Sequence, residues 1–189
     1  MRPAAIVLAA GGARRFGGDT HKLLASARGR RLIEWALLGP LGAAERGAVT
    51  DVIVVGGAVD LTDVVPPGVL LVPNPVWAAG MATSLRAGLD AARRRGASAA
   101  VVGLGDQPGV GTDAWCAVAA ADAPIAVARY PEGRRPPVRL SASTWPLLPS
   151  TGDEGARAVM TAHPELVVEV PIVGNPDDID TQEDLARWS

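Results

Sequence analysis

The stretch that decides the fold runs from residue 4 to residue 24 and reads AAIVLAAGGARRFGGDTHKLL. Residues 4–9 form a continuous apolar run, which is typical of a strand buried on both faces. A glycine-rich segment follows at once, and glycine lets backbone N–H groups approach an anion without obstruction. An apolar strand that opens into such a segment predicts the first strand of an open α/β sheet, with a ligand loop at its carboxyl end.

The segments after this stretch alternate between apolar runs and helical spacing. Further buried strands are expected at residues 51–55, 69–72 and 99–104, and helices at 32–41, 81–95 and 113–121. In the 81–95 helix, Ser84 is expected to cap the start, while the basic run ending at Arg95 and the following Gly96 suit its C-terminal end. This βαβα order predicts an open, mostly parallel α/β sheet with right-handed crossovers.

The pattern changes after Pro124. A strand pair is expected at 125–129 and 138–140 around a loop over 130–137, followed by a helix at 154–161 and a strand at 167–171. A last helix is expected from Thr181, which has capping-box spacing to Asp184. The expected fold class is thus a Rossmann-like α/β sheet with a small antiparallel addition in the C-terminal half. Since no linker or internal repeat interrupts the pattern, one domain over residues 1–189 is expected.

The composition of the 189 residues is that of a globular chain, with 48% hydrophobic and 20% charged residues. The formal net charge is −2 and the basic residues are scattered, which argues against nucleic acid or an anionic membrane as a partner. Cys116 is the only cysteine, and His21 and His163 are the only histidines, so we expect no intrachain disulfide and no thiolate or histidine metal cluster. The N-terminal apolar run is too short for a membrane span and lacks a cleavage region, so a cytoplasmic setting is expected.

Three segments fall at the carboxyl ends of expected strands, where open α/β sheets bind ligands: 11–22, 74–84 and 105–108. The first is not a P-loop, since Gly18 stands where that motif needs lysine, and it is not a G-x-G-x-x-G dinucleotide fingerprint. Lys22 is the only lysine in a chain that otherwise uses arginine, which favours a point contact to phosphate. On this loop alone, an incidental lysine on a mobile surface loop is an equally good interpretation.

Five groups of residues together resemble the signature of the MobA-like nucleotidyltransferases, and within that superfamily the molybdenum-cofactor cytidylyltransferases (MocA-type). They follow the family's order and span most of the chain. They are Leu8-Ala9-Ala10-Gly11 with Arg15-Phe16-Gly17 and Lys22-Leu23-Leu24, the segment 74–89, Leu104-Gly105-Asp106-Gln107-Pro108, Gly152-Asp153-Glu154-Gly155-Ala156-Arg157, and Asp178-Ile179-Asp180-Thr181-Gln182-Glu183-Asp184-Leu185. The resemblance implies a fold like that of the nucleotide-diphospho-sugar transferases.

The resemblance also implies roles for individual residues. Lys22, Arg15 and Asp106 would be catalytic, with Arg15 and Lys22 holding the triphosphate. Asp106 and Asp180 would bind Mg²⁺, an ion that favours one or two carboxylates together with phosphate oxygens and water. The residues implied to bind the nucleotide are Leu8, Ala9, Ala10, Gly11, Gly12, Lys22, Gly80, Met81 and Ser84.

The implied reaction is transfer of a cytidylyl group from CTP to the phosphate of molybdopterin, with release of pyrophosphate. Positioning and charge neutralisation would supply most of the catalysis, and an ionised acceptor phosphate needs no general base. The product would be handed to a molybdoenzyme or its chaperone. Two alternatives stay open: transfer to another small phosphate or sugar phosphate, and a non-catalytic module that binds a nucleotide or cofactor.

Several of these residues also have a purely structural interpretation. Asp106 can simply end a strand before a proline turn, and Asp180 can favour the N-terminus of the last helix through the helix dipole. Trp77 and Met81 can pack in the core as well as line a site. The arginines of segment 134–139 surround a proline-rich stretch, where solvation and binding of an anionic acceptor are about equally expected.

Overall fold

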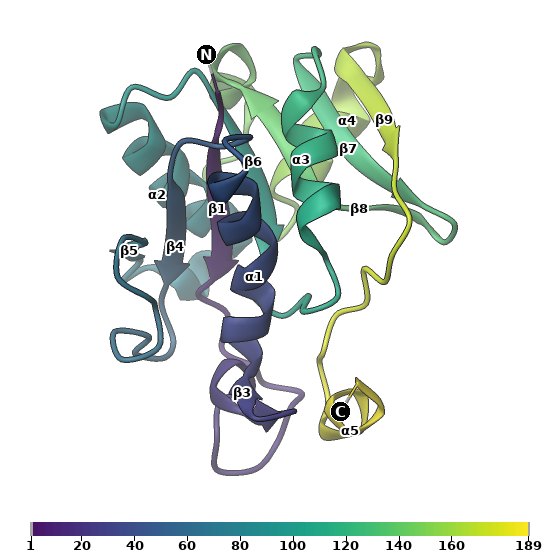
Figure 1. Cartoon of the computed structure of the whole chain (residues 1–189). Coiled ribbons are helices and arrows are strands. Elements are labelled where there is room, and N and C mark those ends of the chain that lie inside the picture. The colour runs from purple at the N-terminus through teal and green to yellow at the C-terminus, as the bar shows by residue number, and fades with distance from the viewer. Residues whose placement is uncertain (1, 189) are drawn as a thin grey trace.

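The computed structural model describes residues 2–188. One seven-stranded sheet runs through the molecule in the order β5-β4-β1-β6-β8-β7-β9 (Figure 1). Its strands are β1 (Ala4–Ala9), β4 (Val52–Gly56), β5 (Leu70–Pro73), β6 (Ala99–Leu104), β7 (Ile125–Tyr130), β8 (Gly133–Ser141) and β9 (Val167–Pro171). All neighbours pair in parallel except β8, which is antiparallel to both β6 and β7. The expected α/β class, with an antiparallel element in the C-terminal half, is confirmed.

Helices cover both faces of the sheet. They are α1 (Leu32–Glu45), α2 (Met81–Arg94), α3 (Thr112–Ala120), α4 (Ala156–Ala162) and α5 (Gln182–Trp188). In Figure 1, α1 and α3 lie in front of the sheet and α2 lies behind it. A short second sheet of β2 (Ser26–Ala27) and β3 (Arg30–Arg31), and short 3₁₀ turns such as η1 (Lys22–Leu24) and η2 (Trp77–Ala79), were not expected from the sequence.

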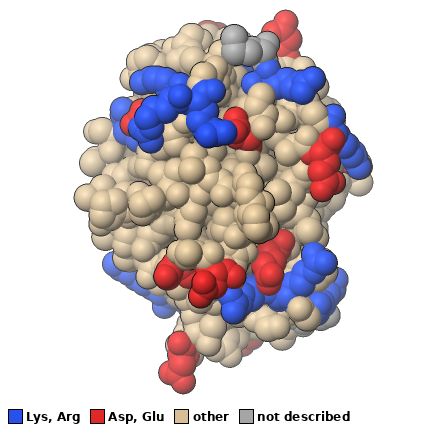
Figure 2. All heavy atoms as spheres, turned by 60° about the vertical axis from the view of Figure 1, so that its left-hand side comes forward, with Lys and Arg blue, Asp and Glu red and all other residues tan. Residues whose placement is uncertain are grey.

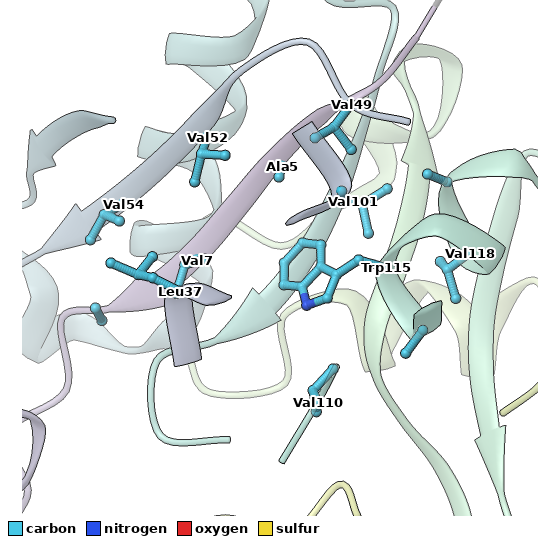
Figure 3. Close-up of a cluster of buried hydrophobic side chains, with 14 of the residues drawn as sticks. Ala5, Val7, Leu37, Val49, Val52, Val54, Val101, Val110, Trp115 and Val118 are labelled. Atoms are coloured by element: carbon cyan, nitrogen blue, oxygen red, sulfur yellow. The ribbon is translucent and has the colours of Figure 1, made fainter. Parts of the chain in front are cut away.

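Alternate residues of β1 serve the two layers of the core. Ala5 and Val7 pack in the cluster beneath α1 and α3, whereas Ala4 and Ile6 pack in the cluster beneath α2. Trp115 of α3 is 2% exposed and lies among valines of the sheet and of α3 in the first cluster (Figure 3). Burial of β1 on both faces explains why its sequence is continuously apolar rather than alternating.

Two helix ends differ from expectation. The helix expected at 32–41 continues to Glu45 through Pro40, because its buried face extends to Ala43, which is fully buried. Ser84 does not cap α2: the helix begins after Gly80, and Ser84 lies buried within its first turns. The Met81 backbone N–H instead donates to Asp153 Oδ1 of a remote segment at 3.2 Å, a cap that local sequence cannot reveal.

The expected loop over 130–137 was wrong, because most of it belongs to β8. Arg134 and Arg135 pair with Arg129 and Ala128, so the hairpin turn is short. The register then shifts between Val127 and Ala128, where 136–137 form the extra residues. Both are prolines, which have no N–H for the ladder, and an irregularity in the pairing accommodates them inside a strand.

The parallel strands all end at the lower edge of the sheet in Figure 1. Figure 2 shows acidic and basic side chains at this end and again at the opposite end, with a broad uncharged middle between them. Between residues 2 and 188, no helix is both long enough and apolar enough to cross a membrane.

Candidate functional site

Lys22 lies at the centre of the candidate site. It opens η1 directly after the glycine-rich loop, and it is only 8% exposed. Its Nζ donates to Asp106 Oδ2 at 2.6 Å and to Asp180 Oδ1 at 2.8 Å. Burial by itself would lower the pKa of Lys22, but the charges and hydrogen bonds of the two carboxylates outweigh it and raise the pKa. Lys22 is therefore a buried, charged ammonium held between two acids.

Backbone contacts bring the two acids together across 74 positions of sequence. Asp106 follows β6, which pairs with β1, and the Gly105 N–H donates to the Leu8 carbonyl at 2.9 Å. The carbonyl of Asp106 accepts from the N–H of Ile179 at 2.9 Å, and the Ile179 side chain is buried. The segment before α5 is thus fastened to the end of β6, which sets Asp180 beside Asp106.

Arg15 joins this cluster from the loop. Its Nη2 lies 2.8 Å from Asp180 Oδ2, and its side chain is 77% exposed. A cavity of about 170 Å³ opens here, and its walls include Arg14, Arg15, Lys22, Asp106 and Asp180, together with Leu8, Ala9 and Gly11. The three residues expected to be catalytic and the two expected to bind a metal therefore meet at one place.

A second cavity of about 340 Å³ shares part of the same wall, including Leu8, Gly11 and Asp106. The remaining residues expected to bind the nucleotide also line it, namely Ala10, Gly12, Gly80, Met81 and Ser84. All nine expected nucleotide-binding residues thus lie around two adjoining cavities, although they come from segments separated by more than fifty positions. Trp77 and Met81 line the second cavity, which favours the site over the core for both.

Two glycines of this wall are required by close packing. A Cβ on Gly12 would come within 3.0 Å of the Trp77 ring. Gly80 has φ +110° and faces the backbone of Gly152, which a Cβ would approach to 2.5 Å. At Gly80 both the backbone conformation and the available space exclude a side chain.

Asn74 organises the other side of the second cavity and was not singled out from the sequence. It is 4% exposed, and its Nδ2 donates to Thr83 Oγ1 and Ser84 Oγ at 2.9 Å each. Its Oδ1 accepts from the Val76 N–H at 3.1 Å. Because Ser84 Oγ accepts from Asn74, its own hydrogen remains for another acceptor. The signals in the sequence are the position of Asn74 just after an expected strand and its place at the start of segment 74–89, which carries part of the resemblance.

Asp178 is a second residue that sequence reasoning missed as a site residue. Although the residue as a whole is exposed, partial desolvation of its carboxyl and the nearby charges of Asp106 and Asp180 raise its pKa to about 6. The signal was present in the Asp178-Ile179-Asp180 spacing. In an extended segment, residues two apart face the same side, and the intervening Ile179 faces the core.

The donors fit a hard divalent cation. Asp106 and Asp180 both turn an oxygen toward the single Lys22 nitrogen, so two carboxylates converge on one positive charge. Residues 2–188 contain no cluster of three or more histidine, cysteine or acidic side chains arranged to hold a metal. An ion at this place would therefore bind two protein oxygens and complete its coordination shell with phosphate and water oxygens, which is the coordination that Mg²⁺ usually has in proteins.

A third and larger cavity of about 720 Å³ adjoins the second and shares Leu8, Leu104, Met81 and Asp153 with it. Its walls combine apolar side chains such as Leu85, Val127 and Met160 with the guanidinium groups of Arg129, Arg134, Arg135 and Arg157. Arg134 is paired with Glu169 at 2.6 Å. Arg139 does not line this cavity, since its Nη1 donates to the Ala123 carbonyl.

Solved structures show where this architecture recurs. A homolog of Mycobacterium tuberculosis rv0371c from Mycobacterium sp. strain JC1 is 28% identical, with a TM-score of 0.80, over 99% of this chain and 94% of that chain. Rv0371c from Mycobacterium tuberculosis H37Rv is 26% identical, with a TM-score of 0.81, over 99% and 97%. A structure of Rv0371c in complex with manganese is 25% identical, with a TM-score of 0.76, over 99% and 97%. The inositol-1-phosphate CTP transferase of T. maritima, 18% identical over 97% and 91% with a TM-score of 0.74, shares the fold.

No curated protein gives a significant match to the chain. The model of the MobA-like NTP transferase domain matches residues 5–167, which include the glycine-rich loop, Lys22 and Asp106. Because this match covers most of the sequence, the chain belongs to the MobA-like NTP transferase family and is a nucleotidyltransferase.

Proposed function

We propose that this chain is a Mg²⁺-dependent cytidylyltransferase that transfers the cytidylyl group of CTP to the phosphate of molybdopterin and releases pyrophosphate. The observation that carries the proposal is the buried ammonium of Lys22 held at 2.6 and 2.8 Å by Asp106 and Asp180. An ammonium and two carboxylates at one cavity match what a metal-bound triphosphate requires. We further propose that residues 1–189 act as one domain in the cytoplasm.

The nucleotide would occupy the first two cavities. Its base and ribose would lie along Leu8–Gly12 and Gly80–Ser84, with the Ser84 hydroxyl free to donate, and its triphosphate would lie toward Arg15 and Lys22. By resemblance, Leu8-Ala9-Ala10-Gly11 favours a pyrimidine nucleotide over a guanylyl nucleotide. Asp106 and Asp180 would hold the ion, and one solved structure of the related Rv0371c is a complex with manganese, which accepts the same oxygen ligands.

The chemistry is an in-line displacement at the α-phosphorus. An oxygen of the acceptor phosphate forms a bond to the α-phosphorus, and the bond from that phosphorus to the bridging oxygen of the β-phosphate breaks. Pyrophosphate leaves with the electron pair, and no proton needs to be removed from the acceptor. Bound Mg²⁺ would supply charge neutralisation for the leaving group. Lys22 and Arg15 would orient the triphosphate and offset its charge. Lys22 is held in position by its bond to Asp106 and Arg15 by its ion pair with Asp180.

The acceptor would enter the third cavity. A wall that combines apolar side chains with four arginines suits a flat ring system that carries a phosphate, and the cavity shares Leu8 and Met81 with the nucleotide site. The cytidylylated product would pass to a molybdoenzyme or its chaperone.

The proposal is tested by pyrophosphate release from CTP with molybdopterin and Mg²⁺, set against ATP, GTP and UTP and against sugar phosphates, with the product mass measured in each case. We expect turnover with CTP and molybdopterin and none after the metal is chelated. Turnover only with another acceptor would overturn the molybdopterin assignment and retain the reaction class. Tight nucleotide binding without turnover, unchanged in Asp106→Ala, would instead indicate a non-catalytic binding module.

A further inference from the structure

His21 makes two hydrogen bonds from one ring. It precedes η1, where its Nδ1 accepts from the Leu23 N–H at 3.3 Å, and its Nε2 lies 2.9 Å from the Gly11 carbonyl oxygen. Since a carbonyl can only accept, Nε2 carries the hydrogen and Nδ1 carries none. Both bonds together therefore require the neutral Nε2–H form. Burial lowers the pKa of His21, and the charge of Lys22 lowers it to a lesser extent, whereas the bond to Gly11 raises it. The net lowering of the pKa favours the neutral form.

The two bonds close the glycine-rich loop at its base. Gly11 lies in the segment along which the nucleotide would lie, and Leu23 follows Lys22, so the ring joins the two ends of the excursion 12–20. Within that excursion only Phe16 is buried. Gly17 and Gly18 adopt φ of +69° and +77°, and glycine loses more conformational freedom on ordering than other residues do. A cross-link at the base of such a loop lowers the cost of ordering it for a ligand.

His21 lines neither of the two cavities at the nucleotide side, so the ring itself has no place in the chemistry. Its neighbour Lys22, by contrast, is buried and reaches Asp106 and Asp180. We infer that His21 is a positioning residue: it ties the turn that carries Lys22 to the carbonyl of Gly11 and so presets the loop for the triphosphate. The identity of the ligand, a nucleoside triphosphate, rests on the proposed function. The ordering of the loop by His21 is a property of the free protein.

Three substitutions separate the two bonds. His21→Gln places an amide donor near the position of Nε2 and keeps the bond to Gly11. His21→Asn keeps an acceptor for the Leu23 N–H, as asparagine does at helix starts, but is too short to reach Gly11. His21→Ala removes both bonds. His163→Ala is the matched control, because His163 is the only other histidine and its ring contacts Glu165, outside the three cavities of the site.

The first measurement is the dissociation constant of magnesium-CTP by titration calorimetry. We expect it to rise about 5- to 10-fold in His21→Ala and His21→Asn, the size of one net hydrogen bond, and to stay within about 2-fold in His21→Gln and His163→Ala. Unchanged affinity in His21→Ala, or rescue by asparagine with no rescue by glutamine, would overturn the inference.

The second measurement is hydrogen exchange of the backbone amides over residues 12–24 in the free protein. Exchange should accelerate in His21→Ala and stay near the wild-type rate in His21→Gln. If the wild-type protein binds no nucleotide, the proposed function fails, and this experiment still decides the role of His21. Equal exchange rates in the wild type and in His21→Ala would show that His21 does not order the loop, even if the protein binds CTP.

Discussion

We propose that the two sides of the site bind the nucleotide and the acceptor and call them the nucleotide side and the acceptor side; different kinds of residue line them. The two cavities at the nucleotide side measure about 170 and 340 Å³ and are lined largely by backbone and small residues, and four of their charged groups, Arg15, Lys22, Asp106 and Asp180, are already bonded to one another. The third cavity measures about 720 Å³ and is lined by long apolar side chains and arginines from β7, β8 and α4. Of these arginines, Arg129 and Arg134 pair with Glu169, whereas Arg135 and Arg157 have no ion pair with any of residues 2–188.

This difference separates what the fold fixes from what a substitution can change. A wall made of backbone, such as Gly80 against Gly152, keeps its shape as long as the strands and turns are formed. A wall made of side chains changes its shape and charge whenever one residue is replaced. We therefore expect changes on the nucleotide side to affect transfer to every acceptor, and changes on the other side to affect the choice of acceptor.

The largest effect is expected from Asp106→Asn. The substitution keeps the shape of the side chain but removes one of the two negative charges around Lys22, so it should lower kcat about 10²- to 10³-fold with every acceptor tested. Steady-state kinetics measure it. Asp113→Asn is the control, because that side chain is 93% exposed and pairs with Arg46 on the surface. A decrease in kcat of less than tenfold, or a decrease with one acceptor only, would contradict the expectation that the nucleotide side affects transfer to every acceptor.

A smaller effect is expected from Arg157→Ala on the acceptor side. A hydrogen bond from a guanidinium to an anionic acceptor contributes about 1.5–3 kcal/mol, so the KM for the acceptor should rise roughly 10-fold or more. The KM for CTP should stay unchanged, since Arg157 lines neither nucleotide cavity. Arg94→Ala, an exposed arginine in the last turn of α2, serves as the control. Equal increases in both KM values would show that the third cavity is not a separate acceptor site.

Local rules predicted the strand and loop at the proposed nucleotide side, whereas the roles of its residues came from the resemblance. The apolar run of β1, the glycines after it and the single lysine each have a direct physical meaning, and parallel strands bring their carboxyl ends to one edge. What the sequence alone could not supply was that Lys22 contacts both Asp106 and Asp180. That geometry depends on the Ile179 N–H bonding to the Asp106 carbonyl, a contact between segments more than seventy positions apart.

The acceptor side was predicted less well for a physical reason. Prolines at 136–137 indicated a loop, whereas a register shift holds them inside β8 and turns Arg134 and Arg135 toward the cavity. The start of α2 at Met81 was predicted, but its capping residue was wrong for the same kind of reason, because the side-chain acceptor comes from Asp153 rather than from Ser84. In both places a tertiary contact overrode a local preference.

The smallest effect is expected from Asp178→Asn, which tests whether the acidic cluster is strained before any ligand binds. The pKa of Asp178 is raised to about 6 from an ordinary value near 3.8, so folding takes up a proton between these two values. Stability associated with this carboxyl is therefore fully present below about pH 3.8 and is lost as the pH rises through about 6.

In the presence of a chelator, Asp178→Asn should unfold at nearly the wild-type denaturant concentration at pH 4 and at a higher one at pH 7. In the Asp106→Asn background this gain should shrink, because one of the charges that disfavours ionised Asp178 is gone. A gain that is the same at both pH values would mean that folding does not raise the pKa of Asp178, so that neither desolvation nor the charges of Asp106 and Asp180 disfavour its ionised form in the free protein.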